Sequence, residues 1–181
     1  MRLKRPYEKV KHLSCNQSSR IVPVLKLIVI HSTEGQNLPG VTDLQNLGSW
    51  FDNPAAQASA HVGIDAQGNS GLYVQDTRKA WHCKNFNGVS LGIELIGRMA
   101  QKSWPSAQER KAAKYVAYWS QRHRIPIRKA KVDDQNSIVK RSGVITHAEL
   151  GVAGGNHADP GAGFNMRRLL WLARGYRLKG W

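Results

Sequence analysis

The chain has 181 residues, a length that suits one domain with a sizeable hydrophobic core. Its hydrophobic fraction of 41% and its six tryptophans exclude a disordered chain, and no apolar run approaches the roughly 20 residues needed to span a bilayer. With 27 Lys and Arg against 12 Asp and Glu, the net charge of +15 predicts attraction to polyanions such as nucleic acid, anionic lipid or anionic cell-wall polymers.

Residues 1–24 are predicted to form a basic N-terminal extension, of which residues 1–20 make an arm or a loosely docked segment. Residues 1–11 lack the apolar stretch of a signal peptide, so we expect no secretory signal and synthesis in the cytoplasm. The two cysteines, Cys15 and Cys83, are too few for a disulfide framework, and free thiols are favoured over a single bridge.

The first regular elements are a strand and a helix. The nearly continuous apolar run over residues 25–30 predicts a buried central strand. Thr42 suits the N-cap of a helix, which Asn53-Pro54 stops. One face of that helix is apolar and consists of Leu44, Leu47, Trp50 and Phe51.

A hairpin and a further strand follow. Residues 59–64 and 71–75 flank the turn segment 65–69, a pattern that is typical of two antiparallel strands. Residues 90–96 are largely apolar and predict another strand of the same sheet.

The second half of the chain begins with a capping box, Ser106-Ala107-Gln108-Glu109, which predicts a helix that Ile125-Pro126 ends. The elements predicted after it are a loop over 129–142, a strand over 143–146 and a helix over 166–174 that stops at Gly175. This order of elements indicates an α/β fold with a single mixed central β-sheet flanked by helices. No linker divides residues 25–181, so we expect one domain without an appended binding module.

Two histidines and one aspartate stand out because of where they fall. His31 and His147 end apolar runs, and strand ends are where α/β sheets collect their ligands. Asp159 lies in a turn-rich segment and precedes Pro160, which stiffens the loop. Together the three would make a three-ligand zinc site with one position open for water. An ordinary Asp-Pro-Gly turn explains Asp159 equally well at this point.

Glu94 interrupts an apolar strand, where a carboxylate is costly unless it is paired or lines a cleft. It therefore either faces solvent or points into a site, and burial there would raise its pKa toward that of a working base. The seven histidines divide into two groups. His12 and His123 are interpreted as surface residues, whereas the other five adjoin apolar or glycine-rich segments: His31, His61, His82, His147 and His157.

Six short motifs follow one another along the chain. They are Ile30-His31-Ser32-Thr33, Ser59-Ala60-His61-Val62-Gly63-Ile64-Asp65, Ala80-Trp81-His82, Ser90-Leu91-Gly92-Ile93-Glu94, Thr146-His147 and Asp159-Pro160-Gly161. In these motifs the sequence resembles the zinc N-acetylmuramoyl-L-alanine amidases of the amidase-2 type, which are related to T7-type lysozyme and to peptidoglycan recognition proteins. The motifs occur in the family's order and cover about residues 25 to 174.

The resemblance implies a role for each matching residue. His31, His147 and Asp159 match the ligands of one zinc ion, and Glu94 matches the acidic residue that activates the water. His157 falls where many relatives have a lysine that stabilises the oxyanion, and Ala60 replaces the catalytic tyrosine of one branch. Residues on the substrate side of the groove are then Thr33, His61, Trp81 and His82.

The activity implied by the resemblance is hydrolysis of the amide bond between N-acetylmuramic acid and L-alanine in bacterial peptidoglycan, with residues 25–181 as the catalytic domain. The alternative is a non-catalytic domain that recognises peptidoglycan, although such relatives lose a metal ligand and this chain has all three. A nucleic-acid partner is not expected, because no helix-turn-helix, zinc finger or stacking strand appears. We expect a monomer that anionic wall polymers attract.

The biological setting implied is that of a phage endolysin, made in the host cytoplasm and released to the cell wall by a holin. A cytoplasmic recycling enzyme is the alternative setting.

Overall fold

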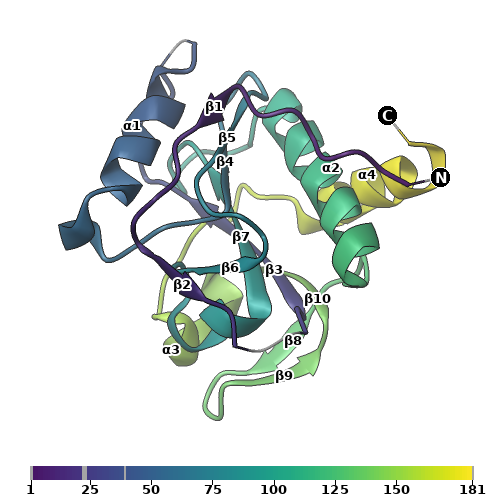
Figure 1. Ribbon diagram of the computed structural model, residues 1–181. Helices are drawn as coiled ribbons and strands as arrows, with labels where there is room; N and C mark the ends of the chain where they lie inside the picture. Colours follow the sequence, from purple (N-terminus) through teal and green to yellow (C-terminus); the bar gives the residue numbers. More distant parts are fainter. Residues whose placement is uncertain (1, 22–23, 39, 181) are drawn as a thin grey trace.

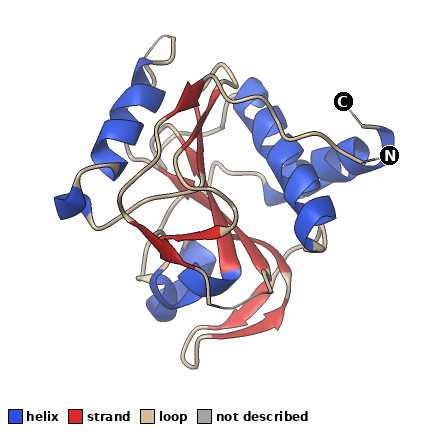
Figure 2. Cartoon of the chain, viewed as in Figure 1, coloured by secondary structure: helices blue, strands red, loops and turns tan. Residues whose placement is uncertain are grey.

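A mixed six-stranded sheet runs through the centre of the computed structural model, which describes residues 2–21, 24–38 and 40–180 (Figure 1). Its strands, in spatial order, are β1 (Val10–Lys11), β5 (Ser70–Leu72), β4 (Val62–Ile64), β7 (Ser90–Leu95), β3 (Leu27–Ser32) and β10 (Gly143–Thr146). Neighbours are parallel except for β4 and β5, which form the predicted antiparallel hairpin. The predicted fold, a single mixed central sheet flanked by helices, is confirmed (Figure 2).

One face of the sheet packs against two long helices, α2 (Ser106–His123) and α4 (Met166–Lys179) (Figure 1). Ile28 and Ile30 of β3 point to this face together with Ile93 of β7, since alternate residues of a strand share a face. Trp119 of α2 is completely buried among them. This apolar layer is the main hydrophobic core.

The opposite face is covered in two separate places. The helix α1 (Thr42–Phe51) lies over β4 and β5, where Phe51 contacts Tyr73 edge to face. A second small core lies under three short helices and includes Leu27 and Val29. Those helices are η2 (Lys84–Val89), η3 (Ala148–Leu150) and α3 (Gly151–Gly154); a fourth, η1 (Pro54–Ala56), follows α1. Between the two covers, the ends of β3 and β7 present polar side chains to a cavity.

The N-terminal segment differs from the expected loosely docked arm. The strand β1 is part of the central sheet, and β2 (Gln17–Ser19) pairs with β6 (Arg78–Ala80) in a second, two-stranded sheet. Ser14 and Asn16 are buried, and both donate hydrogen bonds to the carbonyl of Phe51. The polar and basic composition of the segment does not indicate this docking, because pairing with distant strands holds the segment in place. Residues 1 and 22–23 of the predicted extension lie outside the described residues.

Two predicted boundaries are wrong. The predicted loop 129–142 contains a hairpin of β8 (Lys131–Asp133) and β9 (Ile138–Arg141), in which Val132 pairs with Val139 and both pack against the second core. Their mostly polar neighbours face solvent, so the segment lacks the composition of a strand. The last helix continues through Gly175 and ends before Gly180, whose φ of 77° is left-handed.

The predicted capping box also does not form. The helix α2 begins at Ser106 itself after Pro105, without a side-chain cap. Glu109 instead forms an ion pair with Arg168 of α4, with 2.7 Å between Oε2 and Nε. Among the described residues, none of the helices combines the length and the apolar composition required for a membrane span.

Candidate active site

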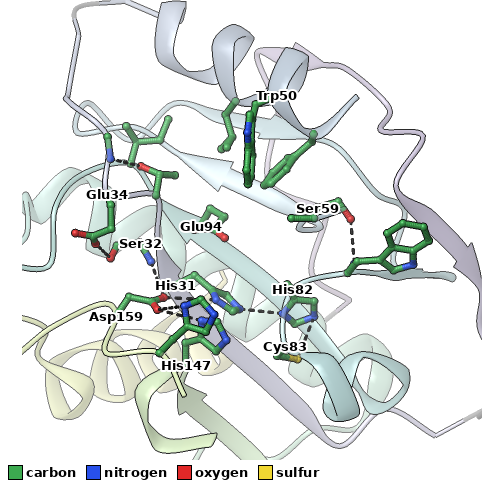
Figure 3. Close-up of a pocket in the computed structure, with 18 of the residues that line it drawn as sticks. His31, Ser32, Glu34, Trp50, Ser59, His82, Cys83, Glu94, His147 and Asp159 are labelled. Atoms are coloured by element: carbon green, nitrogen blue, oxygen red, sulfur yellow. Dashed lines mark hydrogen bonds and ion pairs between the residues drawn. The ribbon is translucent and has the colours of Figure 1, made fainter. Parts of the chain in front are cut away.

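The candidate site lies where three parallel strands end. His31 pairs in register with Glu94 across β3 and β7, so their side chains lie next to each other on one face. His147 directly follows β10, and its N–H donates to the carbonyl of Ile30 at 3.0 Å. Asp159 comes from the loop before α4 and its carbonyl accepts the N–H of Ala148. Figure 3 shows these side chains directed into one space.

The His–His–Asp cluster, which consists of His31, His147 and Asp159, is buried and tightly arranged. Asp159 Oδ1 lies 3.0 Å from His147 Nδ1, and Oδ2 lies 3.5 Å from His31 Nδ1. The N–H of Ser32 donates to Oδ2 at 3.1 Å. One donor atom from each residue falls within 4.8 Å of the others, a span that a small adjustment would close around a metal ion.

Hydrogen bonds fix the protonation of the His31 ring. The Ser90 hydroxyl donates to the carbonyl of Phe86 at 2.8 Å, so its oxygen accepts from His82 Nε2 at 3.0 Å. His82 Nδ1 is then the acceptor for the Nε2–H of His31, 2.9 Å away. His31 Nδ1 is therefore left with a lone pair that faces Asp159. A Cβ at Gly92 would lie 2.8 Å from His82 Nδ1, so only glycine leaves room for this ring.

A contact with the backbone orients the His147 ring. Its Nε2 lies 3.0 Å from the carbonyl oxygen of Gly154, which can only accept, so Nε2 bears the hydrogen. The Nδ1 atoms of both rings then face the Asp159 carboxylate, so a cation between them would contact all three groups. The donor set of two nitrogens and one oxygen is the kind that zinc binds.

The pKa values favour the same interpretation. Burial lowers the pKa of His31 to about 4, so the ring is neutral at physiological pH. Burial alone would raise the pKa of Asp159, but the neighbouring His147 and His31 hold it well below its usual range. A neutral imidazole and an ionised carboxylate are the forms that bind a metal.

Glu94 is the unpaired polar group of the site. Its Oε2 is buried and has no hydrogen-bond partner among the described residues. Burial raises the pKa of Glu94 well above its usual value, and the charges of Asp159 and Glu34 raise it further. A carboxyl group with a raised pKa beside a water-accessible cavity suits proton transfer.

The cavity in front of these residues has a volume of about 710 Å³. Thr33, Trp81 and His82 line it, as the predicted substrate side requires. His61 does not, because its ring is fully buried, accepts the N–H of Gly92 and lies next to Arg20. The structure leaves His61 no surface to offer a substrate, so its function here is to support the sheet.

His157 lies at the edge of the cavity and is half exposed. Its ring stacks on that of His147 with 4.1 Å between centroids, and its Nδ1 is 3.7 Å from Asp159 Oδ1. Burial and the nearby His147 and Lys84 lower the pKa of His157. A neutral ring at this place can donate one hydrogen bond but brings no full charge.

Several groups of the site escaped sequence reasoning. The N–H of Ser32 and the hydroxyl of Ser90 belong to the site only because the fold brings them within hydrogen-bond distance of Asp159 and His82. Lys84 lines the cavity because η2 folds over the strand ends. A signal for Ser90 was available, since a serine at the start of a buried strand needs a hydrogen-bond partner.

Comparison with known proteins gives a family match over most of the chain. The model of the Amidase_2 family, described as N-acetylmuramoyl-L-alanine amidase, matches residues 21–162. N-acetylmuramoyl-L-alanine amidase A of Achromobacter lyticus is 35% identical over 89 residues, which are 48% of this chain and 46% of that protein. The alignment thus spans about half the length of this curated relative.

Solved structures share the fold. A selenomethionine derivative of AmpD superposes with a TM-score of 0.69 at 22% identity, covering 95% of this chain and 99% of that one. The Staphylococcus aureus hydrolase AmiA, solved with its ligand, gives a TM-score of 0.70 at 17% identity, covering 97% and 85%.

Proposed function

The chain belongs to the Amidase_2 family of N-acetylmuramoyl-L-alanine amidases, and on that premise we propose that it hydrolyses the amide bond between N-acetylmuramic acid and the L-alanine of the peptidoglycan stem peptide. The observation that supports this most is the pair of features at the cavity floor. The His–His–Asp cluster has donor atoms within 4.8 Å of each other, and Glu94 beside it is buried and unpaired.

His31, His147 and Asp159 would hold one zinc ion, because their donor atoms converge and the lowered pKa values of His31 and Asp159 suit a divalent metal. When bound, zinc supplies a Lewis acid and lowers the pKa of water from about 15.7 toward about 7. The remaining catalytic tasks fall to side chains of this chain.

Glu94 takes the proton of the attacking water as the water oxygen bonds to the amide carbon. The π electrons of the carbonyl group move onto its oxygen and form an oxyanion. When the oxyanion collapses, the bond between carbon and nitrogen breaks, and Glu94 returns the proton to the leaving amine. His157 can donate a hydrogen bond to the oxyanion, while Thr33, Trp81 and His82 line the cavity that holds the sugar and peptide.

A non-catalytic domain that recognises peptidoglycan is the alternative. Neither the buried cluster nor the unpaired Glu94 has a purpose in such a domain, because binding alone needs no proton acceptor with a raised pKa. Hydrolysis therefore explains more of the site than binding does.

The proposal also covers the domain boundaries, the partners and the biological setting. Residues 25–181 include every group of the site, and we assign them as the catalytic domain, with the first 24 residues as an extension. The net charge of +15 favours contact with anionic wall polymers by a monomer. Release as a phage endolysin through a holin and peptidoglycan recycling in the cytoplasm both accord with this chemistry.

The decisive experiment is digestion of purified sacculi by the protein with and without a chelator, with products identified by mass spectrometry. New free L-alanine amino termini that disappear with the chelator and return with zinc support the proposal. New reducing ends would instead indicate a glycosidase, and intact sacculi after treatment with zinc-loaded protein would favour the recognition domain.

A further inference from the structure

The charge of the cavity is opposite to that of the molecule. The chain as a whole is formally +15. The described residues that line the cavity nevertheless include four carboxylates: Glu34, Asp43, Glu94 and Asp159. Among the lining residues that the structure describes, Lys84 is the one lysine or arginine. The ammonium group of Lys84 forms no ion pair or hydrogen bond with the residues that the structure describes.

The backbone places Lys84 at this position. It is the first residue of η2 and has a φ of 46°, in the left-handed region that non-glycine residues rarely adopt. The N–H groups of His82 and Cys83 both donate to Asn87 Oδ1, at 2.9 and 2.7 Å, and so fix the turn that leads into Lys84. Strained backbone held in this manner is common where a side chain serves a site.

The lysine side chain lies beside the His–His–Asp cluster. A Cβ built on Gly155 would be 3.4 Å from Lys84 Cε and 2.9 Å from His157 Cδ2, so the two side chains cover the same glycine. The His157 ring stacks in turn on His147. Lys84 therefore approaches the same glycine as His157, whose ring contacts a proposed metal ligand.

Amide hydrolysis adds negative charge to this cavity. In the transition state the carbonyl oxygen gains charge in a space that already contains the carboxylates of Glu94 and Asp159. A positive group aimed at that oxygen lowers the barrier, and it is most effective where water is scarce. Lysine is suited to the task because its charge persists at neutral pH.

We propose that Lys84 is a catalytic residue of this chain and stabilises the oxyanion formed at the scissile carbonyl. The inference rests on the proposed amidase function. The lysine neither gives nor takes a proton: its ammonium group donates a hydrogen bond as the carbonyl electrons move onto oxygen, and it releases that oxygen when the bond to nitrogen breaks.

The test compares Lys84→Met with Lys79→Met in a steady-state assay of a soluble muramoyl peptide. Lys79 on β6 lines an adjoining groove but not the cavity, so its substitution removes the same charge from the same region. We expect Lys84→Met to lower kcat about 100-fold with little change in KM, the effect of removing an oxyanion donor, and Lys79→Met to stay near wild type. Lys84→Arg should recover part of the loss.

Zinc content and thermal unfolding are measured for each variant, since methionine keeps the length of the side chain and the same backbone strain. A raised KM with unchanged kcat would overturn the proposal and make Lys84 a binding residue for the ground state. Equal losses in Lys84→Met and Lys79→Met would also overturn it, because they indicate a general effect of charge.

A second variant tests the shared position directly. Because His157 and Lys84 cover the same glycine, His157→Lys in the Lys84→Met background should restore kcat at least about 10-fold. No recovery in a folded double variant with normal zinc content would count against the proposal. Failure of the amidase function is recognised separately, because wild-type protein would then release no L-alanine amino termini in the same assay.

Discussion

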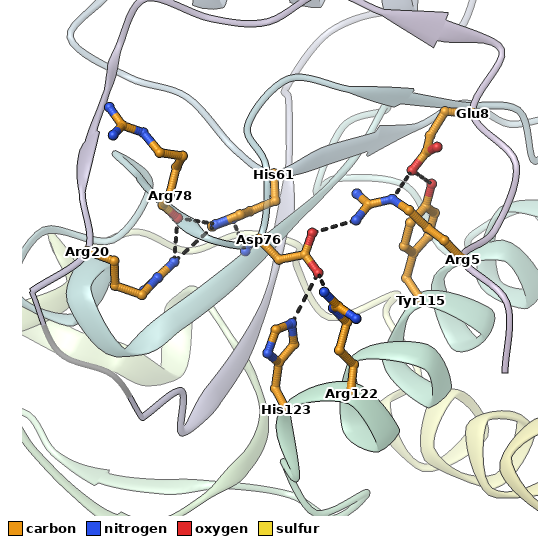
Figure 4. Close-up of polar contacts among 10 residues, drawn as sticks. Arg5, Glu8, Arg20, His61, Asp76, Arg78, Tyr115, Arg122 and His123 are labelled. Atoms are coloured by element: carbon orange, nitrogen blue, oxygen red, sulfur yellow. Dashed lines mark hydrogen bonds and ion pairs between the residues drawn. The ribbon is translucent and has the colours of Figure 1, made fainter. Parts of the chain in front are cut away.

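Two clusters of this molecule each surround a buried aspartate and differ in the partners of its carboxylate. The Asp76 cluster joins Asp76 to Arg5, Arg122 and His123 (Figure 4), and each carboxylate oxygen has a cationic partner. In the His–His–Asp cluster (Figure 3), the Nδ1 atoms of His31 and His147 face a carboxylate, and the adjacent Glu94 Oε2 has no partner among the described residues. The Asp76 carboxylate has an arginine on each oxygen, whereas the ion-pair partners of Asp159 among the described residues are histidines.

This difference in pairing distinguishes a structural cluster from a catalytic one. Both clusters contain a buried aspartate whose pKa lies well below its usual range, although burial alone would raise it. In the Asp76 cluster the cause is the bond with His123 and the charge of Arg5, which together fasten the N-terminal segment to α2. In the other cluster, Glu94 stays unsatisfied at a cost in stability, as is common at active sites.

The largest effect is expected for Asp159→Asn. The amide keeps an acceptor for the N–H of Ser32 but removes the negative charge that the two histidines need beside a metal. We expect zinc to be lost and amide cleavage to fall at least about 1000-fold, beyond the 10- to 100-fold that outer-shell partners contribute. Measured zinc content and product release check this, and a variant that retains both would exclude Asp159 as a ligand.

The second prediction concerns Glu94→Gln. Loss of the proton acceptor should lower kcat about 10²- to 10⁴-fold while zinc stays bound. Because the folded-state pKa of Glu94 is raised, this group contributes stability only below its unfolded pKa and destabilises the fold at pH 7. Glutamine should therefore raise the stability by about 1 kcal/mol at pH 7, with no gain near pH 4. The kinetic assay checks the loss of kcat, and denaturant titrations at the two pH values check the change in stability. An unchanged kcat, or an equal gain in stability at both pH values, would contradict the prediction.

Asp76→Asn should lower the stability and leave the activity unchanged, the opposite of what we expect for Glu94→Gln. Removing one partner of a buried ion pair costs about 3 kcal/mol, here because Arg5 loses one of its two carboxylate partners and keeps only Glu8. The depressed pKa of Asp76 means that its stabilisation is present above the unfolded pKa of about 3.9 and is lost as the pH falls. Urea unfolding of wild type and variant should thus converge at low pH. Activity and zinc content per folded molecule should match wild type, and a loss of bound zinc would break the distinction between the two clusters.

The sequence predicted the elements that are apolar and periodic. The strands β3, β7 and β10 follow from apolar runs that are buried at nearly every position, and the helix α2 follows from apolar residues at helical spacing. Elements held by pairing rather than by composition were missed, such as the hairpin around Val132 and the docking of Ser14 and Asn16.

For the site, sequence reasoning named the three residues that the fold brings together, since His31 and His147 stand at strand ends. It misplaced His61, because a family motif does not reveal which side of a strand becomes buried. It also overlooked Lys84, whose position depends on how closely η2 approaches Gly155. Contacts between distant loops of this kind cannot be read from local patterns.

The smallest expected effect belongs to Ser90→Ala, which tests whether the hydrogen bonds behind His31 matter. Without the hydroxyl, His82 Nε2 loses its acceptor, and the neutral His82 can adopt the tautomer that no longer accepts from His31. We expect zinc affinity, measured by competition with a chelating dye, to fall about 10-fold.

Ser70→Ala is the matched control, because Ser70 is equally buried and bonds to Tyr115 away from the site. Both variants should lose about 1 kcal/mol of stability. If zinc affinity falls equally in both, the effect comes from general loosening of the sheet. If it falls only in Ser90→Ala, the hydrogen-bond chain through His82 holds His31 in its metal-binding form.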